Sequence, residues 1–160
     1  MKVGLKHLTG PYRLSGPAFK RACQDAGGAF DQPCLSLYYD NPATVAEEKL
    51  RYSAGIVLEG PTAGELEQNL VKKGYEIHSF RDTRAVVVTF PFTMGLVSIL
   101  LAVSRCYPAI SEFMKQCGMG PGDSAGAVIE VYRGAPDCTI QYFVPLEGDF
   151  KLHPSFKKNE

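Results

Sequence analysis

Hydrophobic positions alternate with polar ones in several short stretches of the chain, and they recur every three or four residues in three longer stretches. A period of two is typical of strands, and a period of 3.6 is typical of amphipathic helices. The predicted strands are residues 3–8, 34–39, 54–58, 75–80, 85–90, 127–133 and 139–144. The predicted helices are residues 15–26, 62–74 and 93–117, the last one kinked or split by Pro108.

The two halves of the chain echo one another. A strand, Pro11-Tyr12, Gly16 and a helix in the first half correspond to a strand, Pro91-Phe92, Gly95 and a helix in the second half. Each helix leads into two further strands. This repeat predicts an α+β fold of two fused β-α-β-β modules with pseudo-two-fold symmetry, with antiparallel sheets, helices on one side and a central groove. We expect one domain over residues 1–150 and a flexible tail over residues 151–160.

Composition and charge argue against nucleic acid and anionic membranes as partners. The 160 residues are 45% hydrophobic and carry a net charge of +0, so we expect no direct binding of nucleic acid and no attraction to anionic membranes. The most apolar run, residues 94–103, is shorter than the ~20 residues of a membrane span and predicts a buried helix. Five cysteines without a C-x-x-C motif, and no signal-peptide pattern, predict reduced, buried thiols in a cytoplasmic protein.

The strand that ends at Tyr38 and Tyr39 stops at Asp40-Asn41-Pro42, a strong turn signal. Aromatic rings, phenol hydroxyls and a carboxylate therefore gather at one edge of the predicted sheet, as a binding pocket needs. Alternation sends the two tyrosines to opposite faces, so only one of them can line a groove, and the pattern does not say which. Arg51 is a candidate to turn back onto Asp40 and fix this turn.

Glu130 interrupts an otherwise apolar predicted strand and shares one face of it with Val128 and Tyr132. A carboxylate on a half-buried face must be paired, hydrogen-bonded or raised in pKa, and it can then hold a cation or act as a general base. The same pattern also fits a glutamate on an edge strand that points into water. Tyr142, in the following strand, is the expected neighbour of Tyr132.

No cofactor and no metal site are predicted. His7, His78 and His153 show no ligand spacing to one another or to the cysteines, and the chain has no phosphate loop or dinucleotide fingerprint. The stretch Gly122-Asp123-Ser124-Ala125-Gly126 matches G-x-S-x-G. A nucleophile elbow needs a strand before it and a helix after it, whereas here a helix and a loop precede and a strand follows. We therefore interpret this stretch as a loop.

Taken together, the motifs resemble those of the GyrI-like family of small-molecule-binding domains. The matching marks are Gly10-Pro11-Tyr12, Tyr38 to Pro42 with Arg51, Glu130-Val131-Tyr132 and Pro145-Leu146. The resemblance runs from about residue 3 to residue 150 and implies the duplicated β-α-β-β fold. Within the family, the chain is most similar to a branch of vertebrate testis-expressed ER-phagy receptors, which implies a possible protein partner and a role in autophagy.

The resemblance implies three functions. In effector-binding members, a glutamate at the place of Glu130 lies among aromatic rings and receives lipophilic cations, which implies a small hydrophobic or cationic ligand here. The implied ligand-binding residues are Tyr12, Tyr38, Asp40, Phe90, Phe92 and Tyr142. Other members hydrolyse cyclopropanoid compounds, which implies a hydrolase with Glu130 and either Tyr39 or Tyr132 as catalytic residues. A protein adaptor is the third reading, and it would show an exposed apolar patch away from the groove.

Overall fold

The computed structural model describes residues 1–27, 32–93 and 95–157, and it contains every predicted strand and helix with ends shifted by a few residues. The strands are β1 (Lys2–Thr9), β2 (Cys34–Tyr38), β3 (Arg51–Val57), β4 (Glu76–Ser79), β5 (Ala85–Pro91), β6 (Val128–Arg133) and β7 (Thr139–Pro145). The helices are α1 (Ser15–Asp25), α2 (Ala63–Lys72) and α3 (Leu96–Gln116).

The seven strands form one sheet in the order β4-β1-β3-β2-β6-β7-β5, and every pairing between them is antiparallel. The order β1-β3-β2 of the first half matches the order β5-β7-β6 of the second, with β4 added beside β1. The fold is therefore α+β and consists of two β-α-β-β modules related by a pseudo-two-fold axis. The sequence analysis expected a cleft between two sheets, whereas the modules share one continuous sheet through the pairing of β2 with β6.

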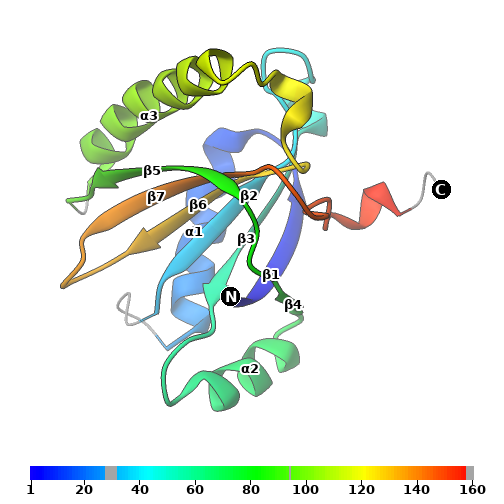
Figure 1. Ribbon diagram of the computed structural model, residues 1–160. Coiled ribbons are helices and arrows are strands. Elements are labelled where there is room, and N and C mark those ends of the chain that lie inside the picture. Colours follow the sequence, from blue (N-terminus) through cyan, green and yellow to red (C-terminus); the bar gives the residue numbers. More distant parts are fainter. Residues whose placement is uncertain (28–31, 94, 158–160) are drawn as a thin grey trace.

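All three helices pack on the same face of this sheet (Figure 1). The helix α3 buries Ala102, Cys106, Ile110 and Met114, which recur every four residues along one side. Pro108 lies within α3 without splitting it, contrary to the expected break. This buried stripe runs on both sides of Pro108, so packing against the sheet holds the helix together although proline removes one backbone hydrogen bond.

The C-terminal segment covers part of the opposite face. Phe150 is buried against Val3 and Leu5 of β1, and its ring lies 5.1 Å from that of Phe80. Further along, the ring of Phe156 lies 3.8 Å from the Arg51 guanidinium carbon. Leu152 and Phe156 of the predicted C-terminal tail therefore contact the rest of the fold. Residues 158–160 of that tail lie outside the described part.

The outer side of α3 stays exposed, so the expectation of a buried helix holds for one side of it only. Its exposed apolar residues are Val97, Leu100, Leu101, Val103 and Phe113. The stretch Val97–Gln116 is long and apolar enough to cross a membrane by length and composition alone, which is weak evidence and marks no clear span. Of the five thiols, Cys117 and Cys138 are exposed rather than buried, and all five are free.

The pairing of β1 with β3 makes a specific demand at Gly55. A Cβ atom at this position would lie 1.9 Å from the carbonyl oxygen of Gly4 and 2.9 Å from Leu5 Cδ2. We expect Gly55→Ala to lower the free energy of unfolding by roughly 3 kcal/mol or more, measured by urea denaturation. Gly64→Ala is the matched control, because a Cβ in this first turn of α2 meets open space and alanine favours helix. Equal stability of the two variants would contradict the strand register.

Candidate functional site

Glu130 lies at the centre of the sheet. It is on β6, paired with Ser36 of β2 on one side and with Tyr142 of β7 on the other. Its residue surface is only 4% exposed, and its side chain points to the face that carries the helices. A central strand with both neighbours in place excludes the alternative of an edge-strand glutamate that points into water.

Two phenols hold the Glu130 carboxyl. The hydroxyl of Tyr107 on α3 donates to Oε1 at 2.7 Å, and the hydroxyl of Tyr132 on β6 donates to Oε2 at 2.5 Å. A third phenol, that of Tyr142, is buried beside them, and its oxygen has no hydrogen-bond partner among the described residues. We call Glu130, Tyr107, Tyr132, Tyr142 and Tyr38 the Glu130 cluster.

Burial dominates the electrostatics of the cluster. It raises the pKa of Glu130, and the two phenol hydrogen bonds oppose this shift without cancelling it. Burial, together with the nearby Glu130 charge, also raises the pKa of Tyr107 and Tyr132, so both phenols remain proton donors. None of the ion pairs found between described residues includes Glu130. The cluster is therefore a desolvated acid without a cation, able to pair with a positive charge or to accept a proton.

Aromatic rings surround this acid on the helix face. The rings of Phe19 on α1 and of Phe92 lie 4.8 and 5.8 Å from the ring of Tyr132, and the ring of Tyr107 lies 5.5 Å from that of Tyr142. Phe90 packs against the edge of the same hydrophobic group. These contacts bring the predicted residues Phe90, Phe92, Tyr132 and Tyr142 together over one part of the sheet.

The two neighbouring tyrosines separate as alternation requires. Tyr38 shares the face of Glu130, where burial and the Glu130 charge raise the pKa of its phenol. Tyr39 lies on the opposite face, where its hydroxyl is 2.8 Å from Ser53 Oγ, which in turn is 2.7 Å from His7 Nδ1. The expectation that Tyr39 acts together with Glu130 is therefore wrong, because the sheet lies between them.

Asp40 and Tyr12 hold the turn that follows β2. The Asp40 carboxylate accepts hydrogen bonds from Arg51 Nη2 at 2.6 Å, from Nε at 2.9 Å and from the Arg51 backbone N–H at 2.7 Å. Burial tends to raise the Asp40 pKa, but these bonds to Arg51 outweigh it and lower the pKa. The Tyr12 hydroxyl bridges the backbone of Asp40 and Arg51. The predicted contact of Arg51 with Asp40 is confirmed, and it occupies both acceptor oxygens of that carboxylate.

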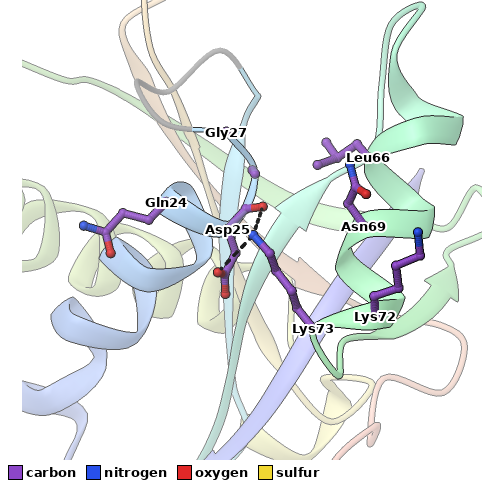
Figure 2. A pocket seen from close by; sticks show the side chains of 8 residues that line it. Gln24, Asp25, Gly27, Leu66, Asn69, Lys72 and Lys73 are labelled. Carbon is purple, nitrogen blue, oxygen red and sulfur yellow. Dashed lines mark hydrogen bonds and ion pairs between the residues drawn. The ribbon is translucent and has the colours of Figure 1, made fainter.

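A pocket of about 320 Å³ lies elsewhere, between the end of α1 and α2 (Figure 2). Its lining residues are Gln24, Asp25, Ala26, Gly27, Leu66, Asn69, Lys72 and Lys73. Asp25, the acid of this pocket, already pairs with Lys73 and accepts a hydrogen bond from Tyr75. None of the cluster residues lines this pocket. Glu130, Tyr132 and Tyr142 are buried, so the acid is shielded from solvent rather than exposed at the floor of an open groove.

Sequence reasoning missed Tyr107 and Phe19 as parts of the site. Tyr107 follows the buried Cys106 at the edge of the apolar stripe of α3. A tyrosine bordering such a stripe was the available signal, but only the packing of α3 over β6 reveals Glu130 as its partner. Phe19 belongs to the apolar stripe of α1, where it reads as an ordinary core residue.

Two known proteins are similar in sequence to nearly the whole of this chain. No family model matches the chain. The sequence is 32% identical to the mouse (Mus musculus) testis-expressed protein 264 homolog and 30% identical to human (Homo sapiens) testis-expressed protein 264, in each case over 164 residues and 99% of this chain. The chain is therefore similar in sequence to a part of testis-expressed protein 264. It spans about half, 49%, of the length of these two relatives.

A solved structure supports the fold. A crystal structure of a hydrolase from Listeria innocua superposes with a TM-score of 0.52 and covers 92% of this chain and 87% of its own. The sequence identity is 11%, so this likeness shows a shared fold alone. Membership of the GyrI-like family stays a prediction.

The raised pKa of Glu130 predicts how stability depends on pH. Below about pH 4.5 the group is protonated both in the folded and in the unfolded chain. As the pH rises towards the folded-state pKa, only the unfolded chain ionises, so the contribution of Glu130 to stability is lost. Compared with Glu130→Gln, the wild type should lose up to about 1.4 kcal/mol of unfolding free energy per pH unit in this window.

Urea denaturation of the two proteins from pH 4 upwards measures this difference. All other titrating groups are common to both proteins and cancel in the comparison. A difference that stays constant, or that moves in favour of the wild type as the pH rises, would contradict a desolvated Glu130.

Proposed function

We propose that this chain is a GyrI-like small-molecule-binding domain that receives a lipophilic cation at the Glu130 cluster. The observation that carries this proposal is a carboxyl group buried at the centre of the sheet, bonded to phenols and without a cation. A desolvated acid of this kind gains most from a ligand that brings the missing positive charge.

The surroundings favour a cation that is also apolar. The faces of aromatic rings attract positive charge, and the rings around Glu130 belong to the tyrosines of the cluster and to the nearby Phe92. The unpartnered Tyr142 hydroxyl offers one further polar contact for a bound molecule. A strongly hydrated cation would lose its water in this apolar setting without replacement, so we expect a lipophilic cation to be preferred.

Entry of a ligand requires α3 to move. Tyr107 and Cys106 of this helix cover Glu130. After the helix ends, Gly118 has a φ of 72°, a left-handed backbone conformation that favours glycine. Apolar residues on the outer side of α3 are exposed, so an outward shift would mainly break contacts on the sheet side. A ligand that displaces Tyr107 would take over its place at Oε1.

Isothermal titration with tetraphenylphosphonium, and with tetraphenylborate as an anion of the same shape, tests this proposal. We expect the cation to bind the wild type and the anion not to bind. Glu130→Gln should weaken binding of the cation by about tenfold or more, since it removes the charge and keeps the shape. Affinity should increase as the pH rises through the Glu130 pKa, because only the ionised carboxylate pairs with the cation.

Tyr39→Phe is the matched control, because it removes a phenol hydroxyl on the opposite face of the sheet. This variant should bind the cation as the wild type does. Equal binding of both ions, or equal binding by the wild type and Glu130→Gln, would refute a charge-selective site at Glu130.

A hydrolase is the second candidate function, supported by the hydrogen-bonded pair of an acid and a phenol. Glu130 would take a proton from a water molecule whose oxygen attacks a strained ring carbon, and Tyr132 or Tyr107 would give a proton to the carbon that leaves. The sum is addition of one water across the broken carbon–carbon bond. The structural neighbour from Listeria innocua is described as a hydrolase. The name of testis-expressed protein 264 states no enzymatic activity.

Turnover of an aryl cyclopropyl ketone, followed by mass spectrometry for the gain of one water, tests this candidate. A hydrolase should form the product with the wild type and lose nearly all of that activity in Glu130→Gln, because the base is then absent. Tyr132→Phe should slow the reaction, whereas Tyr39→Phe should not. Binding of the cation without turnover supports the binding domain, and no binding with no turnover leaves a protein adaptor that uses the exposed side of α3.

A further inference from the structure

A second group of polar side chains gathers on the sheet face opposite Glu130. β1 and β4 pair with Val3 opposite His78 and Leu5 opposite Glu76. Residues two apart in a strand share a face, so Glu76 and His78 lie side by side, and His7 follows Leu5 by two residues on β1. The register of an edge strand therefore brings two imidazoles and a carboxylate together.

The spacing of these groups is that of metal ligands. Glu76 Oε2 lies 3.4 Å from His7 Nε2 and 3.6 Å from His78 Nε2, and the three potential ligand atoms lie within 4.8 Å of one another. These distances are longer than the usual 2.7–3.2 Å of an N–H···O hydrogen bond. Ligands about 2.0–2.1 Å from a tetrahedral zinc ion lie about 3.3–3.4 Å apart, which is close to the two separations measured from Glu76 Oε2.

Two buried nitrogens in this group have no partner. Both His7 Nε2 and His78 Nε2 are buried without a hydrogen bond among the described residues, and the side chain of His7 is only 7% exposed. A buried polar atom without a partner is destabilising by roughly 1–3 kcal/mol. Two such atoms that converge on one carboxylate oxygen indicate a place where the three groups can bind a cation together.

The surroundings of His7 favour the ligand form of its ring. Its other nitrogen, Nδ1, lies 2.7 Å from Ser53 Oγ, directly across the β1–β3 pairing. When Nδ1 donates to this oxygen, Nε2 presents its lone pair to Glu76 and His78. A hydrogen bond to the far nitrogen is the usual way in which proteins orient a metal-bound histidine.

We propose that His7 Nε2, His78 Nε2 and one carboxylate oxygen of Glu76 bind a zinc ion, with Ser53 as the residue that positions His7. Two imidazoles and one carboxylate are donors that suit Zn²⁺ and neighbouring first-row ions, and they suit Mg²⁺ and Ca²⁺ poorly. The Glu76 side chain is 53% exposed, so the fourth position of the ion faces solvent and can take water or a small anion. Because the ligands come from β1 and β4, the ion would also fasten this edge strand to the sheet.

The neighbouring histidine, His153, is a poorer ligand. Its ring lies 5.7 Å from that of His7, but Nδ1 accepts from the Ser155 backbone and lies 2.9 Å from Ser155 Oγ, while Nε2 faces Thr9 Oγ1 at 3.4 Å. Both of its nitrogens therefore face protein partners. His153 closes one side of the site, and its neutral form, favoured by burial, adds no charge there.

Calorimetric titration of the chelator-treated protein with Zn²⁺ alone tests the site, together with Co²⁺ absorption as a report on its ligands. We expect one ion per chain, with a Co²⁺ spectrum of tetrahedral type and without a thiolate charge-transfer band. The substitution Glu76→Gln, at an exposed side chain, should weaken Zn²⁺ binding by at least about tenfold, and His78→Gln should weaken it further. Ser53→Ala should also weaken it by about tenfold, since it removes the group that orients His7.

Two controls make the result specific. Glu65→Gln removes a carboxylate from α2 and should leave Zn²⁺ affinity unchanged, as should Glu130→Gln on the opposite face, so this test is independent of the ligand at Glu130. Dissociation constants weaker than about 100 µM, a thiolate band from Cys117 or Cys138, or unchanged affinity in both Glu76→Gln and His78→Gln would overturn the proposal.

Discussion

The pairing of β2 with β6 is the constraint on which the rest of this structure depends. Each module could bury one face of three strands, but only this pairing joins them into a continuous sheet. The same register sets Ser36 opposite Glu130 and Cys34 opposite Tyr132, so the seam between the modules carries the acid and one of its phenols. Glu130 is buried because it lies at the centre of the joined sheet, and its raised pKa follows from that position.

Local patterns were sufficient to predict most of the fold. Alternation and helical periodicity located every strand and helix, and the echo of Pro11-Tyr12 in Pro91-Phe92 predicted the duplicated modules. The same patterns could not predict a continuous sheet, because the pairing of β2 with β6 joins residues almost a hundred positions apart. They also did not predict the contacts that Leu152 and Phe156 of the tail make with the rest of the fold, since a short tail has no periodicity.

The candidate site shows the same division between local and long-range information. The alternation of side chains along a strand placed Tyr38 and Tyr39 on opposite faces. Only the register of β2 against β6 showed that Tyr38 lies on the same face as Glu130. Tyr107 reaches Glu130 through the packing of a helix on a strand, which has no signature in either segment. The histidines are 71 residues apart in the sequence (78 − 7) and meet through the pairing of β1 with β4, so spacing rules written for single loops or helices do not detect them.

The two faces of the sheet differ in how their buried polar atoms are satisfied. Both oxygens of Glu130 accept a phenol hydrogen bond, so the protein without a ligand has little to gain from a neutral molecule that would have to replace those bonds. Only a ligand that adds a positive charge offers the acid something the phenols do not provide. On the other face, two buried Nε2 atoms make no hydrogen bond among the described residues, so a metal ion there would displace no hydrogen bond of theirs. The first site would therefore select by charge against an existing network, whereas the second would bind by completing one.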